Sequence, residues 1–270
     1  MTDYLAESRI RDGLSRVSYF RNIAGPGTGI CRVCRQPSPT DTCGDCQYIH
    51  QALDGMTCDH TFFLSYIDGH NPQEYTQSAK TMRQYKAHQA PKRLVNDVHL
   101  LTNNMTWIHD ECIREAEGGA EWDVLTFVPS RTKRTEIHPV SSIALNVARI
   151  VGDDAERGGS GRIKRWQMAV GPADDPRNPN ADRFAASVAS FGGARVLLVD
   201  DTWTGGTSIQ SAAAALKDAG AVSVTGLCVA RWLSWNWSSH VPLLEKVTAQ
   251  PYDPFRCIAF DRTCGPPEPW

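Results

Sequence analysis

The chain has almost no net charge and no long hydrophobic run. Its 28 Lys and Arg residues nearly balance its 30 Asp and Glu residues, which leaves a formal charge of −2 over 270 residues. This balance gives no global electrostatic reason to bind nucleic acid or an acidic membrane surface. No apolar stretch approaches the roughly 20 residues of a membrane span, and the N-terminus lacks the apolar core of a secretory signal. We expect a cytoplasmic protein that contacts no membrane.

The segment of residues 194–220 is the most informative part of the chain, although it lacks two common nucleotide-binding patterns. It has neither the Gly-Lys-Ser/Thr ending of a Walker A loop nor the dinucleotide pattern G-x-G-x-x-G. What it has is an unbroken apolar run at residues 196–199, which is typical of a strand buried on both faces of a parallel sheet. Helical spacing of apolar residues follows, and Gly220 stands where a left-handed C-cap is expected.

Between that strand and that helix lie two carboxylates and a turn of small and hydroxyl residues. Asp200 and Asp201 follow the strand. The turn consists of Thr204, Gly205, Gly206, Thr207 and Ser208. Its backbone amides can close around a phosphate, and the carboxylates can hold vicinal hydroxyls. The segment therefore suits a phosphorylated ribose, the alternative being an ordinary strand, turn and helix of a doubly wound domain.

Nine cysteines in a chain without an export signal indicate metal ligands and buried thiols more than disulfides. Four of them form two C-x-x-C pairs: Cys31, Cys34, Cys43 and Cys46. Two such pairs complete a tetrahedron around Zn²⁺ and leave no open position for water, so we expect a structural zinc site. Four unrelated thiols, an iron–sulfur site or a redox pair are the alternatives.

The acidic pair, the Thr/Gly loop and the strand and helix around them resemble the signature of the type I phosphoribosyltransferases. With the cysteine pairs ahead of it, the chain is similar to the ComF-like members of that group, over most of residues 31–232. The resemblance implies an open parallel sheet wrapped by helices. It also implies that Asp200 and Asp201 hold the ribose hydroxyls of 5-phosphoribosyl-1-pyrophosphate (PRPP), that the loop holds its 5′-phosphate, and that Mg²⁺ accompanies the donor.

The expected reaction is transfer of the 5-phosphoribosyl group to a nitrogen acceptor, with release of pyrophosphate. The resemblance assigns the pyrophosphate to a basic turn after the expected strand at 123–129. That turn contains Ser130, Arg131, Lys133 and Arg134, with His138 shortly after. Guanidinium groups can bind the oxygens of pyrophosphate in a bidentate manner. The alternative is that these residues form a solvated charged turn. Thr204 stands where some purine-specific relatives carry an Asp, so either the acceptor needs no general base or the base lies elsewhere.

Residues 152–182 are rich in Gly, Pro and charge, which predicts a long loop. We expect a lid over the reacting centre, whose closure would exclude water and bring Arg162, Lys164 and Arg165 to the pyrophosphate. A surface insertion is the alternative.

Four parts are expected along the chain. They are an N-terminal helix and linker (1–30), a zinc ribbon-like module (31–58), the phosphoribosyltransferase domain with a helical insertion near 72–118 (59–232), and a C-terminal hood or tail (233–270). The tail contains Cys257 and Cys264, which could bind a second metal with His240 or could simply be thiols. A homodimer is a possible assembly.

A different class of function stays open beside catalysis. The same fold could serve a non-catalytic protein that senses the donor or a nucleotide, or an accessory factor for DNA uptake. The cysteine module has few basic residues, Arg32 and Arg35, and Asp41 and Asp45 oppose them. The intact acidic pair and the basic turn favour an enzyme, and nucleic-acid binding is not favoured.

Overall fold

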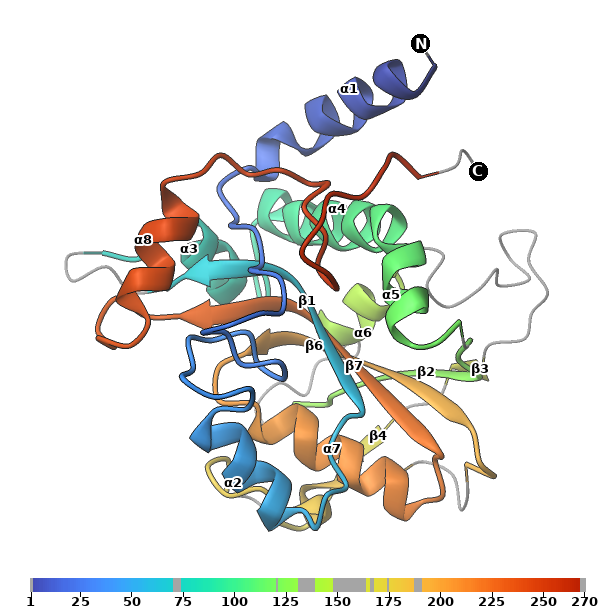
Figure 1. The fold of residues 1–270 in the computed structure, drawn as a ribbon. Coiled ribbons are helices and arrows are strands. Elements are labelled where there is room, and N and C mark those ends of the chain that lie inside the picture. The colour runs from blue at the N-terminus through green and yellow to red at the C-terminus, as the bar shows by residue number, and fades with distance from the viewer. Residues whose placement is uncertain are drawn as a thin grey trace.

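A parallel sheet of five strands forms the centre of the protein (Figure 1), in the order β1-β7-β6-β2-β3. The structure is a computed structural model that describes residues 2–69, 74–119, 121–130, 139–147, 164–165, 168–173, 175–186 and 191–267. The five strands are β1 (His60–Asp68), β7 (Ser223–Leu233), β6 (Arg195–Trp203), β2 (Val124–Phe127) and β3 (Lys164–Arg165). A separate antiparallel pair joins β4 (Met168–Val170) and β5 (Phe184–Ala186).

Helices lie on both faces of this sheet, so the predicted open parallel sheet wrapped by helices is confirmed. The α-helices are α1 (Thr2–Leu14), α2 (Gly44–Ala52), α3 (Gln77–Gln84), α4 (Lys92–Ile108), α5 (Asp110–Ala116), α6 (Pro139–Ala144), α7 (Thr207–Asp218) and α8 (Val241–Thr248). Two short 3₁₀ helices cover Ser15–Val17 and Ala181–Arg183. The expected helices at the N-terminus and within 72–118 are present.

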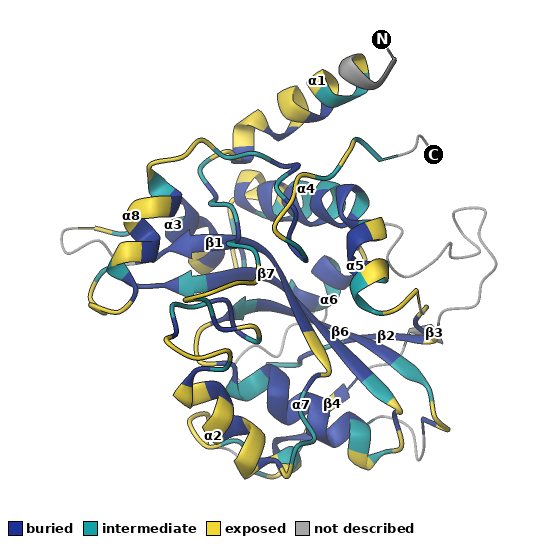
Figure 2. Ribbon diagram, viewed as in Figure 1, coloured by how far each residue is buried: buried dark blue, intermediate teal, exposed yellow. Residues whose placement is uncertain are grey.

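The strands alternate between two cores. In β6, Leu197 and Val199 pack into the core beneath α4 and α6, whereas Val196 and Leu198 face the core that contains α7. All four are buried, as the dark strands of Figure 2 show. Coverage of both faces is the reason why this strand is apolar without interruption.

The sheet has an additional strand at each edge, beyond the three central strands β7, β6 and β2. β1 pairs with β7 at one edge, and β3 pairs with β2 at the other. Both β4 and β3 fall inside residues 152–182, which were predicted to be a loop, and that prediction was wrong at Met168–Val170 and at Lys164 and Arg165. Two residues of polar sequence give no strand signal, and the pairing with Val124 and Leu125 is what makes them a strand.

The C-terminal part after α8 is held by packing instead of secondary structure. Residues 249–267 contain no helix or strand, yet Phe255, Cys257 and Ile258 are almost fully buried in the core that includes α4. Among the helices that the structure describes, none has the length and apolar character to cross a membrane.

Candidate functional site

The two carboxylates lie on the last part of a strand instead of after it. β6 continues through Asp200 and Asp201 to Trp203, and Asp200 pairs in register with Cys228 of β7. Both aspartates are buried, with exposed fractions of 8% and 7%. The sequence placed the end of this strand at Val199, because carboxylates are unfavourable inside a buried strand unless a site uses them.

The two carboxylates have different surroundings. The hydroxyl of Tyr85 and the ammonium of Lys86 each donate to Oδ2 of Asp201 at 2.6 Å. Tyr85 and Lys86 follow the end of α3, so that helix delivers a cation to the acidic pair. Asp200 accepts a hydrogen bond from the Asp201 backbone N–H at 2.8 Å, and no ion pair to Asp200 occurs among the described residues.

These surroundings give the pair asymmetric charge behaviour. Burial, followed by repulsion from the carboxylate of Asp201, raises the pKa of Asp200 well above its ordinary value. The ammonium of Lys86 acts in the opposite direction. A cation or a hydrogen-bond donor that approached Asp200 would therefore relieve a buried, uncompensated charge.

The turn after β6 has a shape that only glycine permits at one position. Gly206 has φ +88° and precedes the first residue of α7. A Cβ atom there would lie 2.2 Å from Cζ2 of Trp203, whose indole is buried beneath the turn. Thr207 and Ser208 already belong to the first turn of α7, so the predicted loop places backbone amides at a helix N-terminus.

An open pocket of about 420 Å³ lies in front of this turn. Its lining consists of Asp200, residues 202–209, Pro176 and Arg177. All five predicted loop residues and one of the two predicted carboxylates thus face one space. Asp201 does not line that pocket and lies beside it with Tyr85 and Lys86.

Two further cations approach the turn from the segment before β6. Nη2 of Arg183 donates to Oγ of Ser208 at 3.3 Å, and Arg177 lines the pocket. The backbone N–H of Asn180 donates to Ser211 of α7 at 3.0 Å and fixes the segment there. Sequence analysis did not identify Arg177 or Arg183, because a Pro- and Asp-rich stretch carries no spacing that tells where its arginines point.

Most of the predicted basic turn lies outside the described residues. Ser130 is described and follows β2, at the same carboxyl edge of the parallel sheet as the acidic pair. Arg131, Lys133, Arg134 and His138 are outside the described part of the chain, as is Arg162. Their assignment to pyrophosphate and the lid expected from 152–182 stay predictions.

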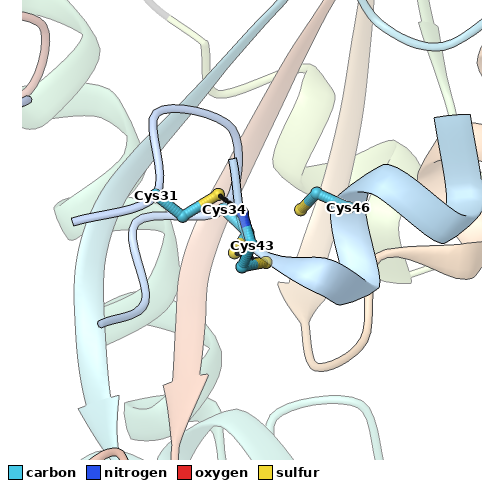
Figure 3. Close-up of side chains that lie close together, drawn as sticks. All are labelled: Cys31, Cys34, Cys43 and Cys46. Carbon is cyan, nitrogen blue, oxygen red and sulfur yellow. Dashed lines mark hydrogen bonds between the residues drawn. The ribbon is translucent and has the colours of Figure 1, made fainter. Parts of the chain in front are cut away.

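The four predicted cysteine ligands come together (Figure 3), and we call them the knuckle cluster. Cys31, Cys34, Cys43 and Cys46 are all buried, and their sulfur atoms lie within 4.8 Å of one another. The Sγ atoms of Cys34 and Cys43 are 3.6 Å apart. In a tetrahedral zinc site with Zn–S bonds of about 2.3 Å, that separation is about 3.8 Å.

Local backbone geometry supports metal ligation at the knuckle cluster. The backbone N–H of Cys43 donates to Sγ of Cys31 at 3.3 Å, a bond that favours thiolate over thiol. The first C-x-x-C turn is followed by Arg35 with φ +57°. The second pair reaches its place because Cys43 caps α2 and Cys46 lies in its first turn. Gly44 is the first residue of that helix.

A buried guanidinium connects the knuckle cluster with the phosphate-loop candidate. Arg231 on β7 is 1% exposed, and its Nε donates to the carbonyl of Cys34 at 2.7 Å. Its Nη1 donates to the carbonyls of Trp203, Thr204 and Trp232, and its Nη2 donates to Oε1 of Gln36. One side chain therefore fixes the backbone at Cys34 of the knuckle cluster and at the start of the turn.

His240, which the sequence suggested as a metal ligand together with Cys257 and Cys264, does not lie near these two thiols, so that prediction was wrong. His240 precedes α8, and its Nδ1 accepts a hydrogen bond from the backbone N–H of Ser234 at 3.1 Å. It does not approach Cys257 or Cys264, which lie beside α5.

No family model matches the chain, and no curated protein matches its sequence. Solved structures with a limited likeness include orotate phosphoribosyltransferase from Mycobacterium tuberculosis H37Rv, at 17% identity over 60% of this chain and 81% of that one, with a TM-score of 0.27. A phosphoribosyltransferase from Corynebacterium diphtheriae is also 17% identical to this chain. The match covers 58% of this chain and 95% of that one, with a TM-score of 0.28. A hypoxanthine phosphoribosyltransferase from Staphylococcus aureus is 8% identical to this chain. That match covers 49% of this chain and 74% of the other, with a TM-score of 0.28. TM-scores this low do not establish a shared fold.

Proposed function

We propose that the protein transfers the 5-phosphoribosyl group of PRPP to a nitrogen acceptor and releases pyrophosphate. One observation carries the proposal: Asp200 and the turn of residues 204–208 face the same pocket at the carboxyl edge of a parallel sheet. Ligands of open parallel sheets bind at that edge. A carboxylate beside a helix N-terminus fits a ligand that has both hydroxyls and a phosphate.

The turn would bind the 5′-phosphate of the donor. The amides at the start of α7 and the positive end of the helix dipole both favour an anion there. Arg183 beside Ser208 and Arg177 on the pocket add positive charge on the same side. Gly206 lets the turn approach closely over the indole of Trp203.

The acidic pair would bind the ribose. Asp200, which faces the pocket, accepts hydrogen bonds from ribose hydroxyls, and Tyr85 and Lys86 hold the carboxylate of Asp201 in a fixed orientation. Mg²⁺ bound with the donor would neutralise pyrophosphate and supply a partner for the buried negative charge. The bond from C1 of the ribose to pyrophosphate breaks while the bond from C1 to the acceptor nitrogen forms. A carboxylate near C1 stabilises the positive charge that develops.

The acceptor would bring its own nucleophilic nitrogen. Thr204 has no carboxylate to exchange a proton with a base, and its carbonyl is already used by Arg231. A nucleobase, ammonia or another amine would each fit this arrangement. We assign no general base to the described residues.

The knuckle cluster would hold one Zn²⁺ with a structural role. Four thiolates fill a tetrahedral coordination sphere, so no position is open for a substrate or a water molecule. Through the carbonyl of Cys34 and the side chain of Arg231, the metal would stabilise the backbone at Thr204. Its contribution to catalysis would therefore be to fix the shape of the phosphate site.

Calorimetry with PRPP and Mg²⁺, followed by a pyrophosphate-release screen over nucleobases and amines, tests the proposal. Wild-type protein should bind PRPP, and the double variant Asp200→Asn with Asp201→Asn should lose the Mg²⁺-dependent part of that affinity. Glu245→Gln on α8 is the matched control, because it removes one exposed carboxylate that does not line the pocket. No PRPP binding at millimolar concentration would contradict the proposal.

Two alternatives give different results in the same experiments. A non-catalytic sensor would bind the donor or a nucleotide without releasing pyrophosphate with any acceptor. An accessory factor for DNA would bind DNA tightly and lose affinity steeply with salt. The knuckle module offers little for this, because Arg32 is paired with Asp41 at 2.9 Å and Arg35 is buried. A homodimer and a cytoplasmic location stay predictions.

A further inference from the structure

A second group of metal-ligating side chains lies far from the pocket, where the C-terminal segment meets α4 and α5. We call it the tail cluster. It consists of His109, Cys112, Cys257 and Cys264. The first two come from the junction of α4 and α5, and the other two come from the segment after α8 (Figure 1). His109 and Cys264 are 155 residues apart in the chain.

The four ligand atoms have the spacing of a tetrahedral zinc site. All of them lie within 4.8 Å of one another. Nδ1 of His109 is 3.7 Å from Sγ of Cys112 and 3.4 Å from Sγ of Cys264. Bond lengths of about 2.3 Å to sulfur and about 2.0 Å to nitrogen give a nitrogen–sulfur separation of about 3.5 Å at tetrahedral angles. Both observed distances are close to that value.

The imidazole of His109 is oriented as a metal ligand. It is fully buried, and its Nε2 lies 3.0 Å from the carbonyl oxygen of Pro254. A carbonyl only accepts, so Nε2 carries the proton and Nδ1 presents its lone pair to the thiols. Zinc-binding histidines commonly use their other ring nitrogen in this way, which fixes both the ring and its tautomer. This bond is independent evidence that Nδ1 is arranged to donate electrons.

The tail is folded to present its two sulfurs. The N–H of Cys257 donates to the carbonyl of Arg262, and the N–H of Cys264 donates to that of Phe255, so the segment turns back on itself. The N–H of Phe260 donates to Sγ of Cys257 at 3.3 Å. The same kind of bond links Cys43 to Cys31 in the knuckle cluster.

We propose that the tail cluster binds a second Zn²⁺, in a closed structural site with three thiolates and one imidazole. Four protein ligands leave no position for a substrate, so the metal would join two parts of the fold. A disulfide explains the cluster less well, because three thiols leave one over and an inward-pointing Nδ1 would have no purpose. This inference does not depend on the proposed transferase activity.

The second metal would hold the C-terminal segment and, through it, the N-terminal helix. Asp253 exchanges hydrogen bonds with Asn22 and accepts one from Arg11 of α1 at 2.8 Å. Phe255 is buried beneath the guanidinium of Arg11. A segment of this length without helix or strand has few backbone bonds of its own, so coordination of Cys257 and Cys264 to a metal would add to the packing that holds it in one conformation.

Metal analysis of the purified full-length chain tests the proposal. Mass spectrometry under native conditions, with elemental analysis, should find two zinc ions per chain. Cys264→Ser should retain one ion and Cys43→Ser should retain the other, whereas Cys58→Ser should keep both, because Cys58 is a buried cysteine outside the two clusters. Cobalt substitution of the Cys264→Ser and Cys43→Ser proteins should give two different sulfur-to-metal absorption spectra.

One zinc ion in the wild-type protein that disappears in Cys43→Ser would overturn the proposal. Alkylation of the wild-type protein tests, without any variant, whether a metal holds the tail thiols. Cys112, Cys257 and Cys264 should resist alkylation until a chelator is added. Rapid alkylation of the native protein, or a disulfide found by non-reducing mass spectrometry, would also contradict a second metal. Limited proteolysis should cut the tail at least tenfold faster after chelation, and an unchanged rate would argue against the fastening role.

Discussion

The knuckle cluster and the tail cluster are built on the same principle but differ in how far apart their ligands lie in the chain. Both bring four metal-ligating side chains within 4.8 Å of one another. The knuckle cluster takes its ligands from residues 31–46, so two short turns suffice to form it. The ligands of the tail cluster come from residues 109–112 and 257–264. A sequence motif therefore indicates all four residues of the knuckle cluster, whereas the sequence indicates only Cys257 and Cys264 of the tail cluster and tertiary packing adds His109 and Cys112.

The two clusters also differ in what they contact. The knuckle cluster is linked through the carbonyl of Cys34 and the side chain of Arg231 to the turn at Thr204. The tail cluster is linked through Asp253 to Asn22 and Arg11. We infer that metal at the first cluster affects donor binding, and that metal at the second affects the attachment of the two chain ends.

The sharpest test of this difference is to remove one ligand from each cluster and compare PRPP affinity. Cys43→Ser should weaken Mg²⁺-dependent PRPP binding by about tenfold or more, equivalent to about 1.4 kcal/mol. The reason is that loss of the metal frees the backbone that Arg231 holds. Cys264→Ser should change the same affinity by less than about twofold. Calorimetry at equal fractions of folded protein measures both.

Equal losses of PRPP affinity in the two variants would contradict the inferred difference between the clusters. Such a result would mean that the whole molecule loosens when either metal is lost. Circular dichroism before each titration separates unfolding from a local effect. Cys58→Ser is the control here too, because it removes a buried thiol from neither cluster.

Arg231→Met tests the link itself. The guanidinium has acceptors in Cys34, Trp203, Thr204, Trp232 and Gln36, and the side chain is 1% exposed. A methionine of similar length leaves buried carbonyls without donors, at about 1–3 kcal/mol each. We expect a destabilisation of at least about 3 kcal/mol, measured by urea unfolding.

A smaller change at the same link provides the control for that variant. Gln36→Ala removes a single acceptor and should cost about 1 kcal/mol. If Arg231→Met and Gln36→Ala destabilise the protein equally, the carbonyl contacts carry no stability and the link between metal and turn is not supported.

Local patterns were enough to predict much of the site. An apolar run bounded by Asp200 and Asp201, followed by a Thr/Gly turn and a helix, predicted the strand, the turn and α7 in order. The structure confirms the sheet, and it places five loop residues and Asp200 on one pocket. It extends β6 to Trp203, because a site can keep carboxylates in a strand where propensity alone would end it.

The residues that sequence analysis missed are those that tertiary contact selects. Lys86 reaches Asp201 from just after α3, and Arg183 reaches Ser208 from the segment before β6. Neither residue belongs to a spaced motif. His109 is similar: a lone histidine inside a helical stretch is typical of a buried core residue. Its role becomes visible only when the C-terminal segment lies beside it.

At the other end of the link, Gly206→Ala tests how firmly the turn is defined. Its φ of +88° and the 2.2 Å approach of a Cβ to Trp203 both oppose a side chain. We expect a destabilisation of about 2–4 kcal/mol. Gly205→Ala is the matched control for stability, since a Cβ there meets nothing within 4 Å. Thermal denaturation of both compares them, and equal melting temperatures would contradict the described turn.

Asp200→Asn should separate stability from donor binding. The pKa of Asp200 is raised by burial and by Asp201, so the folded state binds its proton more tightly than the unfolded state. Stability is therefore highest below the unfolded pKa of about 3.9 and is lost as pH rises through the folded pKa. The asparagine removes this loss, so at neutral pH we expect Asp200→Asn to have a higher melting temperature than the wild-type protein.

PRPP binding should respond to pH in the opposite direction. In the wild-type protein, affinity should increase as pH rises through the folded pKa of Asp200, because the ionised carboxylate is the form that binds Mg²⁺ and ribose. Asp200→Asn should show weak binding that does not change with pH. A wild-type affinity with the same pH dependence as that of Asp200→Asn would contradict this role for Asp200.

The smallest effect should come from the exposed side of the knuckle cluster. Arg32 and Asp41 form an ion pair at 2.9 Å, with side chains 68% and 75% exposed. Such pairs contribute less than about 1 kcal/mol, so Asp41→Asn should change the free energy of unfolding by less than about 0.5 kcal/mol. It should also leave zinc content and PRPP affinity unchanged. Because Asp41→Asn frees the cation of Arg32 beside the knuckle cluster, a gain of tight, salt-sensitive DNA binding in this variant would support the nucleic-acid alternative over catalysis.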